Sequence, residues 1–248
     1  MRKFGLIGCP LEHSFSKKYF ADKFRSEGIT DSYYENFALT DIEQLPGLIH
    51  SQQLNGLNVT IPYKEKVISY LHETDEVVQS LKACNCIKVY PDGKLKGFNT
   101  DVTGFRISLK DQLTPRHNRA LILGEGGAAK AVRYVLEELG IPYLTVSRRE
   151  NLPSGTIHYR ELTNEMVARH PLIINTTPVG MFPHVNACPP IPYEAIGKGH
   201  FLFDLIYNPE TTLFLKKGEE RGALTSNGYR MLILQAEAAW QIWNSKEY

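Results

Sequence analysis

Residues 120–129 read Ala-Leu-Ile-Leu-Gly-Glu-Gly-Gly-Ala-Ala, an apolar run followed by a glycine loop and the start of a helix. The spacing of Gly124, Gly126 and Ala129 matches the fingerprint G-x-G-x-x-(G/A) of dinucleotide-binding proteins. The first glycine permits a tight turn, the second lets a pyrophosphate approach the backbone, and the small third residue lets the helix pack on its strand. The alternative is an ordinary strand, turn and helix. Because a strand precedes the loop and a helix follows it, we expect a nucleotide site at the helix N-terminus.

The next expected strand ends in Val146-Ser147-Arg148-Arg149, about 20 residues beyond the loop. In dinucleotide-binding folds, a residue at this place contacts the 2′ position of the ribose. Arg148 and Arg149 favour NADP over NAD, because a guanidinium pairs bidentately with a 2′-phosphate. The alternative is a strand end that is only solvated. Glu125 does not fit easily, since a carboxylate inside the loop repels pyrophosphate unless its side chain points to solvent.

Outward from the loop, strand-like and helix-like segments alternate along the chain. Strands are expected at 4–8, 55–61, 86–98 (two runs around the turn 91–93), 120–123, 144–146, 171–175 and 200–205. Helices are expected at 16–27, 101–113, 128–139 and 213–221, and one is expected to begin at Pro62. This alternation predicts an α/β fold with a parallel sheet and helices on its faces. The polar break at 114–118 places a domain boundary within 100–119.

Composition excludes several classes of protein. The 248 residues carry 28 Lys+Arg against 27 Asp+Glu, a net charge of 28 − 27 = +1, which argues against a nucleic-acid surface. No apolar run approaches the roughly 18–20 residues of a membrane span, and no signal peptide is read at the N-terminus. The four cysteines and eight histidines lack metal-ligand spacing, so no metal is expected. We expect a cytoplasmic protein whose cysteines are reduced.

Polar residues interrupt two apolar patterns. Asn58 and Thr60 alternate with the apolar residues of the strand at 55–61 and therefore share one face. Lys64 follows Pro62 in the expected first turn of a helix, where the helix dipole disfavours a cation and so favours proton donation. The alternative for Lys64 is an exposed surface lysine. In the C-terminal helix, Gln235 stands in the middle of a stripe of apolar residues at helical spacing: Met231, Leu232, Ala238, Ala239 and Ile242. The alternative for Gln235 is a core glutamine with partners inside the protein.

Three further polar residues stand at helix starts. Asp101 follows Asn-Thr at the start of the helix predicted at 101–113. Ser14 and Ser16 precede the helix predicted at 16–27. All three are candidates for ligand binding, and the alternative for each is helix capping.

Taken together, these features resemble the shikimate dehydrogenase family over nearly the whole chain. Residues 8–16 resemble its Gly-x-Pro…His-Ser-x-Ser signature, residues 58–64 its Asn-Val-Thr-x-Pro-x-Lys block, and residues 97–101 its Asn-Thr-Asp stretch. Four more segments resemble family blocks, at 83–85, 175–181, 204–209 and 228–235. Seven blocks in the expected order make the resemblance specific.

The resemblance implies an α/β substrate-binding domain (1–101 plus 228–248) and a Rossmann-like NADP-binding domain with a parallel sheet (102–227). It implies NADP-dependent, reversible reduction of 3-dehydroshikimate to shikimate. With the composition, we expect a cytoplasmic monomer or homodimer that binds neither nucleic acid nor membrane. The implied catalytic residues are Lys64 and Asp101. The implied substrate-binding residues are Ser14, Ser16, Asn58, Thr60, Asn85, Tyr207 and Gln235. The implied cofactor-binding residues are Gly124, Gly126, Gly127, Ala128, Ser147, Arg148, Arg149, Leu205, Gly228 and Met231.

The chain departs from the family pattern at three places. Lys17 stands where a proline usually follows the second serine, Glu125 replaces a small loop residue, and Ser147-Arg148-Arg149 replaces Asn-Arg-Thr. Three alternatives remain: a quinate/shikimate dehydrogenase that uses NAD, a non-catalytic nucleotide-binding homologue, and an unrelated Rossmann reductase. Arg148 argues against the first, Lys64 and Asp101 against the second, and the N-terminal Ser-x-Ser block against the third.

Overall fold

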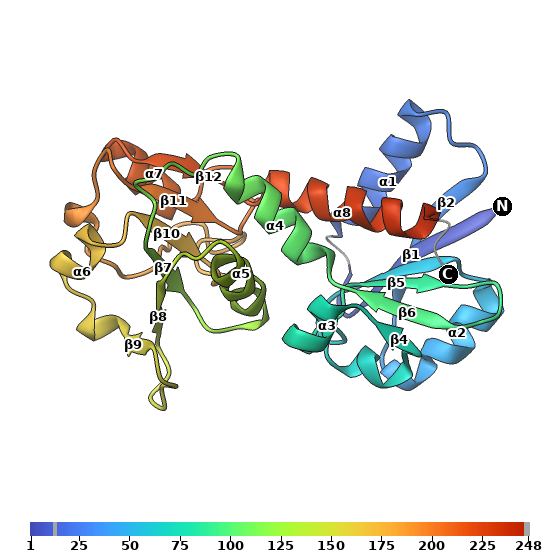
Figure 1. Ribbon diagram of the computed structural model, residues 1–248. Helices are drawn as coiled ribbons and strands as arrows, with labels where there is room; N and C mark the ends of the chain where they lie inside the picture. Colours follow the sequence, from blue (N-terminus) through green and yellow to red (C-terminus); the bar gives the residue numbers. More distant parts are fainter. Residues whose placement is uncertain (12–13, 246–248) are drawn as a thin grey trace. The chain divides into compact units, whose positions relative to one another are not determined.

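The chain forms two compact units in the computed structural model, which describes residues 1–11 and 14–245. Unit 1 comprises Met1–Asp101 and Gln235–Tyr248, and unit 2 comprises Val102–Leu234. Two helices, α4 (Thr100–Lys110) and α8 (Tyr229–Asn244), belong in part to each unit (Figure 1). Each unit contains a six-stranded sheet, so the predicted two-domain α/β class is confirmed.

The sheet of unit 1 is mixed. Its strand order is β2 (Ser32–Ala38), β1 (Arg2–Gly8), β3 (Gly56–Val59), β5 (Cys86–Val89), β6 (Leu95–Phe98) and β4 (Glu73–Thr74). Strand β1 is parallel to β2 and β3, whereas β5 is antiparallel to both β3 and β6. The two strands predicted around the turn at 91–93 therefore form a hairpin.

Helices cover both faces of this sheet (Figure 1). Helices α1 (Phe15–Ser26) and α8 lie on one face, and α2 (Leu45–Gln52), α3 (Glu76–Leu81) and the 3-10 helix η2 (Lys66–Tyr70) contribute to the core on the other. The two cores are separate because strand side chains alternate: Phe4 packs with α1 and α8, and Ile7 with the opposite set. Trp243 of α8 stacks on Phe4 with ring centroids 4.8 Å apart. A Cβ at Gly56 would lie 2.4 Å from Trp243 Cδ1, so this approach requires glycine.

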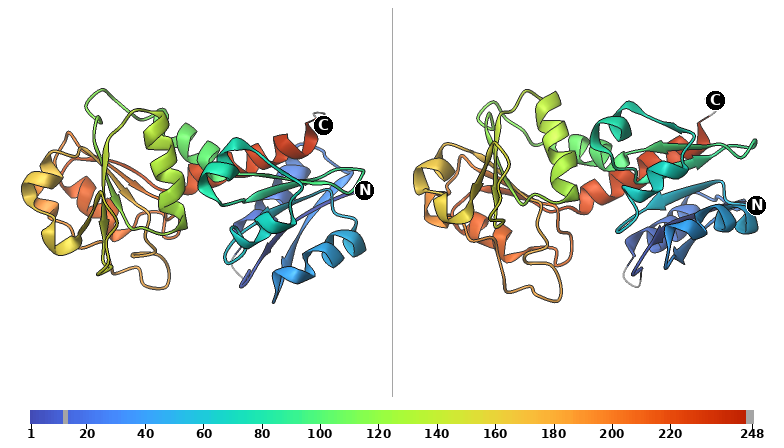
Figure 2. Two further views of the ribbon diagram at one scale, coloured as in Figure 1. Left: turned by 60° about the horizontal axis from the view of Figure 1, so that its bottom comes forward. Right: turned by 90° about the horizontal axis from the view of Figure 1, so that it is seen from below.

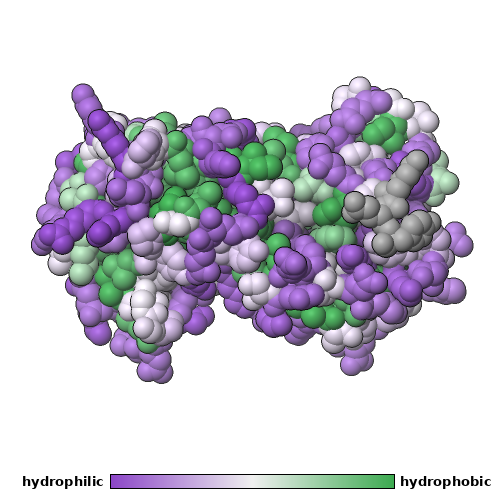
Figure 3. Space-filling model, in the orientation of Figure 1, coloured by the Kyte–Doolittle hydropathy of each residue, from purple (hydrophilic) through white to green (hydrophobic). Residues whose placement is uncertain are grey.

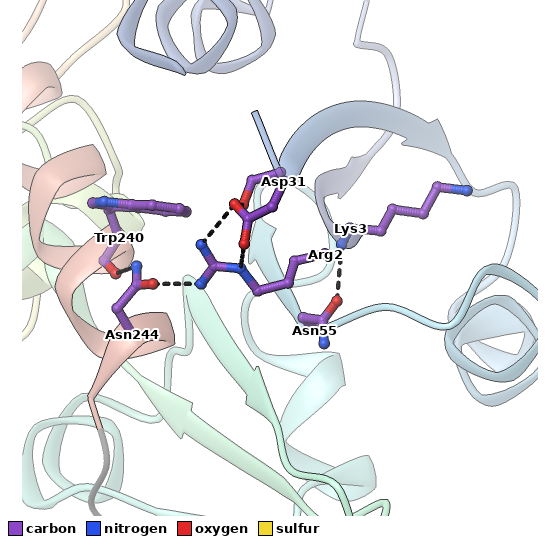
Figure 4. Close-up of polar contacts among 7 residues, drawn as sticks. Arg2, Lys3, Asp31, Asn55, Trp240 and Asn244 are labelled. Carbon is purple, nitrogen blue, oxygen red and sulfur yellow. Dashed lines mark hydrogen bonds and ion pairs between the residues drawn. The ribbon is translucent and has the colours of Figure 1, made fainter. Parts of the chain in front are cut away.

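Arg2 ties β1 to α8 (Figure 4). Its guanidinium donates to both carboxylate oxygens of Asp31 at 3.2 and 3.3 Å and lies 5.3 Å from the ring centroid of Trp240. It also hydrogen-bonds Asn244 at the end of α8. The neighbouring amide of Lys3 donates to Asn55 Oδ1 at 2.8 Å, which fixes the chain just before β3. These contacts help to hold residues 235–244 of α8 in unit 1.

The sheet of unit 2 is entirely parallel. Its strand order is β12 (Leu224–Ser226), β11 (Phe201–Asp204), β10 (Leu172–Asn175), β7 (Ala120–Leu123), β8 (Tyr143–Ser147) and β9 (Thr156–His158). All five strand pairs are parallel. Read from β9, this is the doubly wound order 3-2-1-4-5-6, in which ligands bind at the carboxyl ends of the strands where the order reverses. That switch point lies between β7 and β10.

Helices also cover both faces of this second sheet (Figure 2). Helix α5 (Gly127–Glu138) buries Val132 and Leu136 completely on one face, where Phe105 of α4 also packs edge-on against Phe203 at 5.3 Å. On the other face, α6 (Asn164–Ala168) and α7 (Leu213–Glu220) contribute Val167 and Phe214 to a core with the strands. Unit 2 is thus a three-layer Rossmann-like fold, as predicted.

Two local predictions were wrong. No α-helix begins at Pro62: the chain makes turns there, and only the 3-10 helix η2 follows. Tyr63 is buried and donates its hydroxyl to Leu39 O at 2.7 Å, and Lys64 O accepts from Cys84 N at 2.8 Å. These tertiary contacts hold the backbone outside a regular helix. In α8, the buried residues are Gln235, Ala236, Ala239 and Trp243, so the stripe is rotated from the predicted one.

The surface seen in Figure 3 is mostly hydrophilic, with apolar residues in separate small groups. Within residues 1–11 and 14–245, no helix has the length and apolar character needed to cross a membrane. The same ranges contain no group of three or more His, Cys, Asp or Glu side chains placed to hold a metal ion.

Candidate active site

Lys64 and Asp101 form an ion pair in unit 1. Lys64 Nζ donates to Asp101 Oδ2 at 2.7 Å. Lys64 lies in the turn before η2, and Asp101 in the first turn of α4. Their side chains are 33% and 23% exposed, so the pair is partly shielded from water yet open to a ligand. The structure therefore brings together the two residues for which the sequence predicted catalytic roles, although Lys64 is not at a helix N-terminus as expected.

A buried polar network lies beside this pair. Asn58 on β3 donates from Nδ2 to Asn85 O at 3.3 Å. Asn85 Oδ1 accepts from Thr100 N at 2.7 Å, and its Nδ2 donates to Thr100 Oγ1 at 3.1 Å. Thr100 directly precedes Asp101 in α4. The two asparagines, both predicted substrate ligands, thus also fix the start of the helix that carries Asp101.

Tyr34 is a member of this network that the sequence did not reveal. Its hydroxyl donates to Asn58 Oδ1 at 2.8 Å, and its side chain also hydrogen-bonds Ser16. Burial raises the pKa of Tyr34 well above its usual value, so the hydroxyl keeps its proton and remains a donor. Tyr34 therefore fixes the orientation of the Asn58 amide. The sequence predicted no strand at 32–38, so it contained no signal for this role.

The two N-terminal serines differ in their environments. Ser14 occupies the N-cap position of α1 but makes no side-chain capping bond, and its buried Oγ has no hydrogen-bond partner within the described residues. The capping alternative for Ser14 is thus not realised. Ser16 is buried beside Tyr34. Glu12 and His13 of the same signature lie outside the described residues.

The remaining predicted substrate ligands lie in three places. Thr60 is half-buried just beyond β3, and a Cβ at Gly8 would lie 2.3 Å from its Cγ2. Gln235 is buried on α8 in unit 1. Tyr207 belongs to unit 2, where it is 36% exposed and where burial raises the pKa of its hydroxyl. Cys84, next to Asn85, is a buried thiol, and burial raises its pKa to about 12, as is typical of structural rather than reactive cysteines.

The glycine loop of unit 2 has the geometry that its sequence predicted. Gly124 has φ +107°, and a Cβ there would lie 2.7 Å from Thr177 Cγ2 and 2.8 Å from Thr176 Oγ1. Gly126 is the N-cap of α5, and neither it nor Gly127 has any atom near the position of a Cβ. Ala129, the third position of the fingerprint, is fully buried. Packing therefore requires a small residue at Gly124 and Ala129, whereas the space beside Gly126 and Gly127 is open to a ligand.

The end of β8 presents the two arginines to solvent. Arg148 and Arg149 are both exposed. Ser147 is buried instead, and its Oγ accepts from Arg149 N at 3.2 Å, so its hydroxyl shapes the turn. Arg149 Nη1 lies 3.9 Å from Glu125 Oε2. The carboxylate that the sequence could not explain is thus paired, loosely, with one of the two arginines.

The carboxyl ends of β10 and β11 carry a second buried network. Asp204 accepts from Asn175 Nδ2 at 3.0 Å, from Ile206 N at 3.0 Å and from Thr212 Oγ1 at 2.6 Å. Gly228 packs against the neighbouring segment, since a Cβ there would lie 2.1 Å from Leu205 O. Leu205 and Met231 are half-buried. Asp204 was not predicted from the sequence, but a carboxylate at the end of an otherwise apolar strand is the signal that could have revealed it.

Asp204 is expected to make stability depend on pH. Burial raises its pKa from 3.8 to about 6. A raised pKa means that the fold favours the protonated form, so its stabilising contribution is present below about pH 4 and is lost as the pH rises through about 6. Asp204→Asn keeps the acceptor for Asn175 and Ile206 and can donate to Thr212. The free energy of unfolding of the variant, relative to wild type, is expected to rise by about 2 kcal/mol between pH 4 and pH 7. Urea titrations across this range test it, and parallel curves would contradict it.

The chain is similar to known proteins over nearly its full length. Residues 6–87 match the family model described as the shikimate dehydrogenase substrate binding domain. A curated relative from Caldicellulosiruptor bescii, named shikimate dehydrogenase (NADP(+)), is 36% identical, and the alignment covers 98% of this chain and 89% of the relative.

The chain is also similar to solved structures over nearly its full length. A chorismate mutase/shikimate 5-dehydrogenase fusion protein from Clostridium acetobutylicum is 35% identical with a TM-score of 0.87, covering 98% of this chain and 91% of that one. Shikimate 5-dehydrogenase from Thermus thermophilus, solved in complex with NADP(H) and shikimate, is 30% identical with a TM-score of 0.84, covering 98% and 94%.

Proposed function

The chain belongs to the shikimate dehydrogenase family, and on that premise we propose which of its residues perform the family's reaction. It is an NADP-dependent oxidoreductase that reversibly reduces 3-dehydroshikimate to shikimate, a step of the shikimate pathway. The observation that carries the assignment of roles is the ion pair of Lys64 with Asp101, partly buried and 2.7 Å long.

The residues of unit 2 fit NADP. The open space at Gly126 and Gly127 admits a pyrophosphate to the exposed N-terminus of α5, where backbone N–H groups and the helix dipole attract anions. Arg148 and Arg149 are exposed after the end of β8, and we assign the 2′-phosphate to them, because a guanidinium pairs bidentately with phosphate. When bound, NADP supplies the hydride that is exchanged with the substrate carbon. Gly124, Ala128, Ser147, Leu205, Gly228 and Met231 complete the proposed cofactor site.

Lys64 moves the proton in this proposal. During reduction, Lys64 Nζ donates a proton to the C3 oxygen of 3-dehydroshikimate, and in the reverse direction it accepts the proton of the C3 hydroxyl. Its positive charge also stabilises the negative charge that develops on this oxygen. Asp101 holds Nζ in place through the 2.7 Å hydrogen bond and contacts the same hydroxyl.

Hydroxyl and amide groups bind the rest of the substrate. Ser14 offers a buried Oγ that makes no hydrogen bond within the described residues, and a ligand oxygen would satisfy it. We assign the ring hydroxyls and carboxylate to Ser14, Ser16, Asn58, Thr60, Asn85, Tyr207 and Gln235. Unit 1 corresponds in this proposal to the substrate-binding domain (1–101 plus 228–248) and unit 2 to the NADP-binding domain (102–227). The enzyme is proposed to work in the cytoplasm as a monomer or homodimer.

The test follows the absorbance of reduced nicotinamide with purified protein. Shikimate is added with NADP⁺ and, in parallel, with NAD⁺, and quinate replaces shikimate as the control substrate. We expect rapid reduction of NADP⁺ by shikimate and little reaction with quinate. Greater turnover of quinate with NAD⁺ would identify a quinate-type enzyme instead, and no turnover by the folded protein would identify a non-catalytic homologue.

A further inference from the structure

Glu125 stands between Gly124 and Gly126, inside the loop proposed to hold a pyrophosphate. Its side chain is only 12% exposed, so the carboxylate is not turned out into solvent. Within residues 1–11 and 14–245, its Oε2 atom has no hydrogen-bond partner. A buried carboxylate oxygen without a donor is costly and is expected to find one when a ligand binds.

The surroundings of Glu125 are polar. It borders a cavity of about 480 Å³ between α5, β8 and the start of β9, lined also by Arg133, Tyr143, Thr145, Ser154 and Thr156. The ion-pair partner of Oε2 is Arg149 Nη1, at 3.9 Å, which is too long for a hydrogen bond. Arg149 is itself 66% exposed, so its guanidinium remains free to bind a second anion.

With NADP bound as proposed, two anionic groups, the 2′-phosphate and the Glu125 carboxylate, would lie close to Arg149. The 2′-phosphate of NADP is proposed to bind Arg148 and Arg149, and Glu125 places a negative charge within 4 Å of the second of these. Charges this close interact appreciably even at a protein surface. The carboxylate opposes a phosphate there, whereas it can accept a hydrogen bond from the free 2′-hydroxyl of NAD.

Resting on the cofactor site proposed above, we propose that Glu125 is a specificity-determining residue that lowers the preference of this enzyme for 2′-phosphorylated nucleotides. The arginines attract the 2′-phosphate, and Glu125 reduces that attraction. The enzyme therefore discriminates less between NADP and NAD than its two arginines alone would dictate.

The test measures nucleotide binding directly, without turnover. Isothermal titration calorimetry gives the Kd of 2′,5′-ADP, which carries the 2′-phosphate, and of 5′-AMP, which does not. In Glu125→Gln, which keeps the shape and removes the charge, affinity for 2′,5′-ADP is expected to rise about tenfold. The affinity for 5′-AMP is expected to change little, because the glutamine oxygen can still accept a hydrogen bond from the 2′-hydroxyl. Glu150→Gln is the matched control, because Glu150 adjoins Arg149 in sequence but pairs with Arg160 at 3.8 Å. It is expected to change neither affinity.

Other results overturn the proposal in distinguishable ways. If Glu125→Gln leaves the affinity for 2′,5′-ADP unchanged or weakens it, Glu125 does not oppose the phosphate and the inference fails alone. The proposed function is tested separately, by whether the wild-type enzyme oxidises shikimate with NADP⁺. If wild type binds neither nucleotide, the proposed cofactor site fails and the inference fails with it. A parallel gain in kcat/KM for NADP⁺ but not NAD⁺ in Glu125→Gln is expected to accompany the gain in affinity.

Discussion

Replacing Lys64 by alanine is expected to lower kcat for shikimate oxidation about a thousandfold while changing KM little. The ammonium group moves the proton of the reacting hydroxyl, and alanine cannot replace it as a base or as a positive charge. Because this interaction strengthens as charge develops, its loss affects the transition state more than the bound substrate. Steady-state kinetics with saturating NADP⁺ measures both constants.

Lys66→Ala is the matched control for this experiment. Lys66 is exposed and lies two residues beyond Lys64 at the start of η2, so its removal is expected to leave both constants near wild type. Lys64→Arg keeps the positive charge but not the compact ammonium group, and it is expected to recover little activity. An increase of KM at unchanged kcat in Lys64→Ala would show that Lys64 only binds substrate, which is the opposite of the proposed role.

The fold of unit 2 could be predicted because local signals agreed with tertiary packing. The apolar runs at 120–123, 171–175 and 200–205 became β7, β10 and β11, which are central strands with both faces covered. Such strands are nearly continuously apolar. Strands β2, β9 and β12 lie at sheet edges and were not predicted, because their sequences mix polar and apolar residues.

The segment after Pro62 shows why a local signal failed. Proline suits the first turn of a helix, and the sequence therefore predicted one there. The buried Tyr63 side chain and the backbone hydrogen bond between Cys84 and Lys64 instead hold residues 62–65 in turns. Contacts from residues far along the chain decided this conformation, and local sequence does not contain them.

The candidate site was predicted only in part. Resemblance named Lys64 and Asp101 separately, but their hydrogen bond joins residues 37 positions apart and required the structure. Asn58 and Asn85 were expected to face substrate, and the structure adds that their amides also bond to protein groups. The role of Tyr34 depends on the register of β1 between β2 and β3, which no local pattern defines.

Replacing Asp101 by asparagine is expected to lower kcat about a hundredfold, again with little change of KM. Asparagine has nearly the same shape, so the start of α4 and its bonds to Asn85 are retained, but the negative charge that holds Lys64 Nζ at 2.7 Å is lost. Lys64 is then no longer fixed toward the reacting oxygen. Asp22→Asn is the control, since Asp22 is an exposed carboxylate on α1 in an ion pair with Arg25, and it is expected to leave kcat unchanged.

The combination of both substitutions separates a functional pair from two independent residues. If Asp101 acts by positioning Lys64, its substitution removes nothing further once Lys64 is gone, so Lys64→Ala/Asp101→Asn is expected to be about as slow as Lys64→Ala alone. Multiplication of the two losses, to about a hundred-thousandfold, would show that the carboxylate and the ammonium act separately. The 2.7 Å hydrogen bond between Asp101 Oδ2 and Lys64 Nζ favours the first outcome, because it ties the carboxylate directly to the ammonium group whose position it would fix.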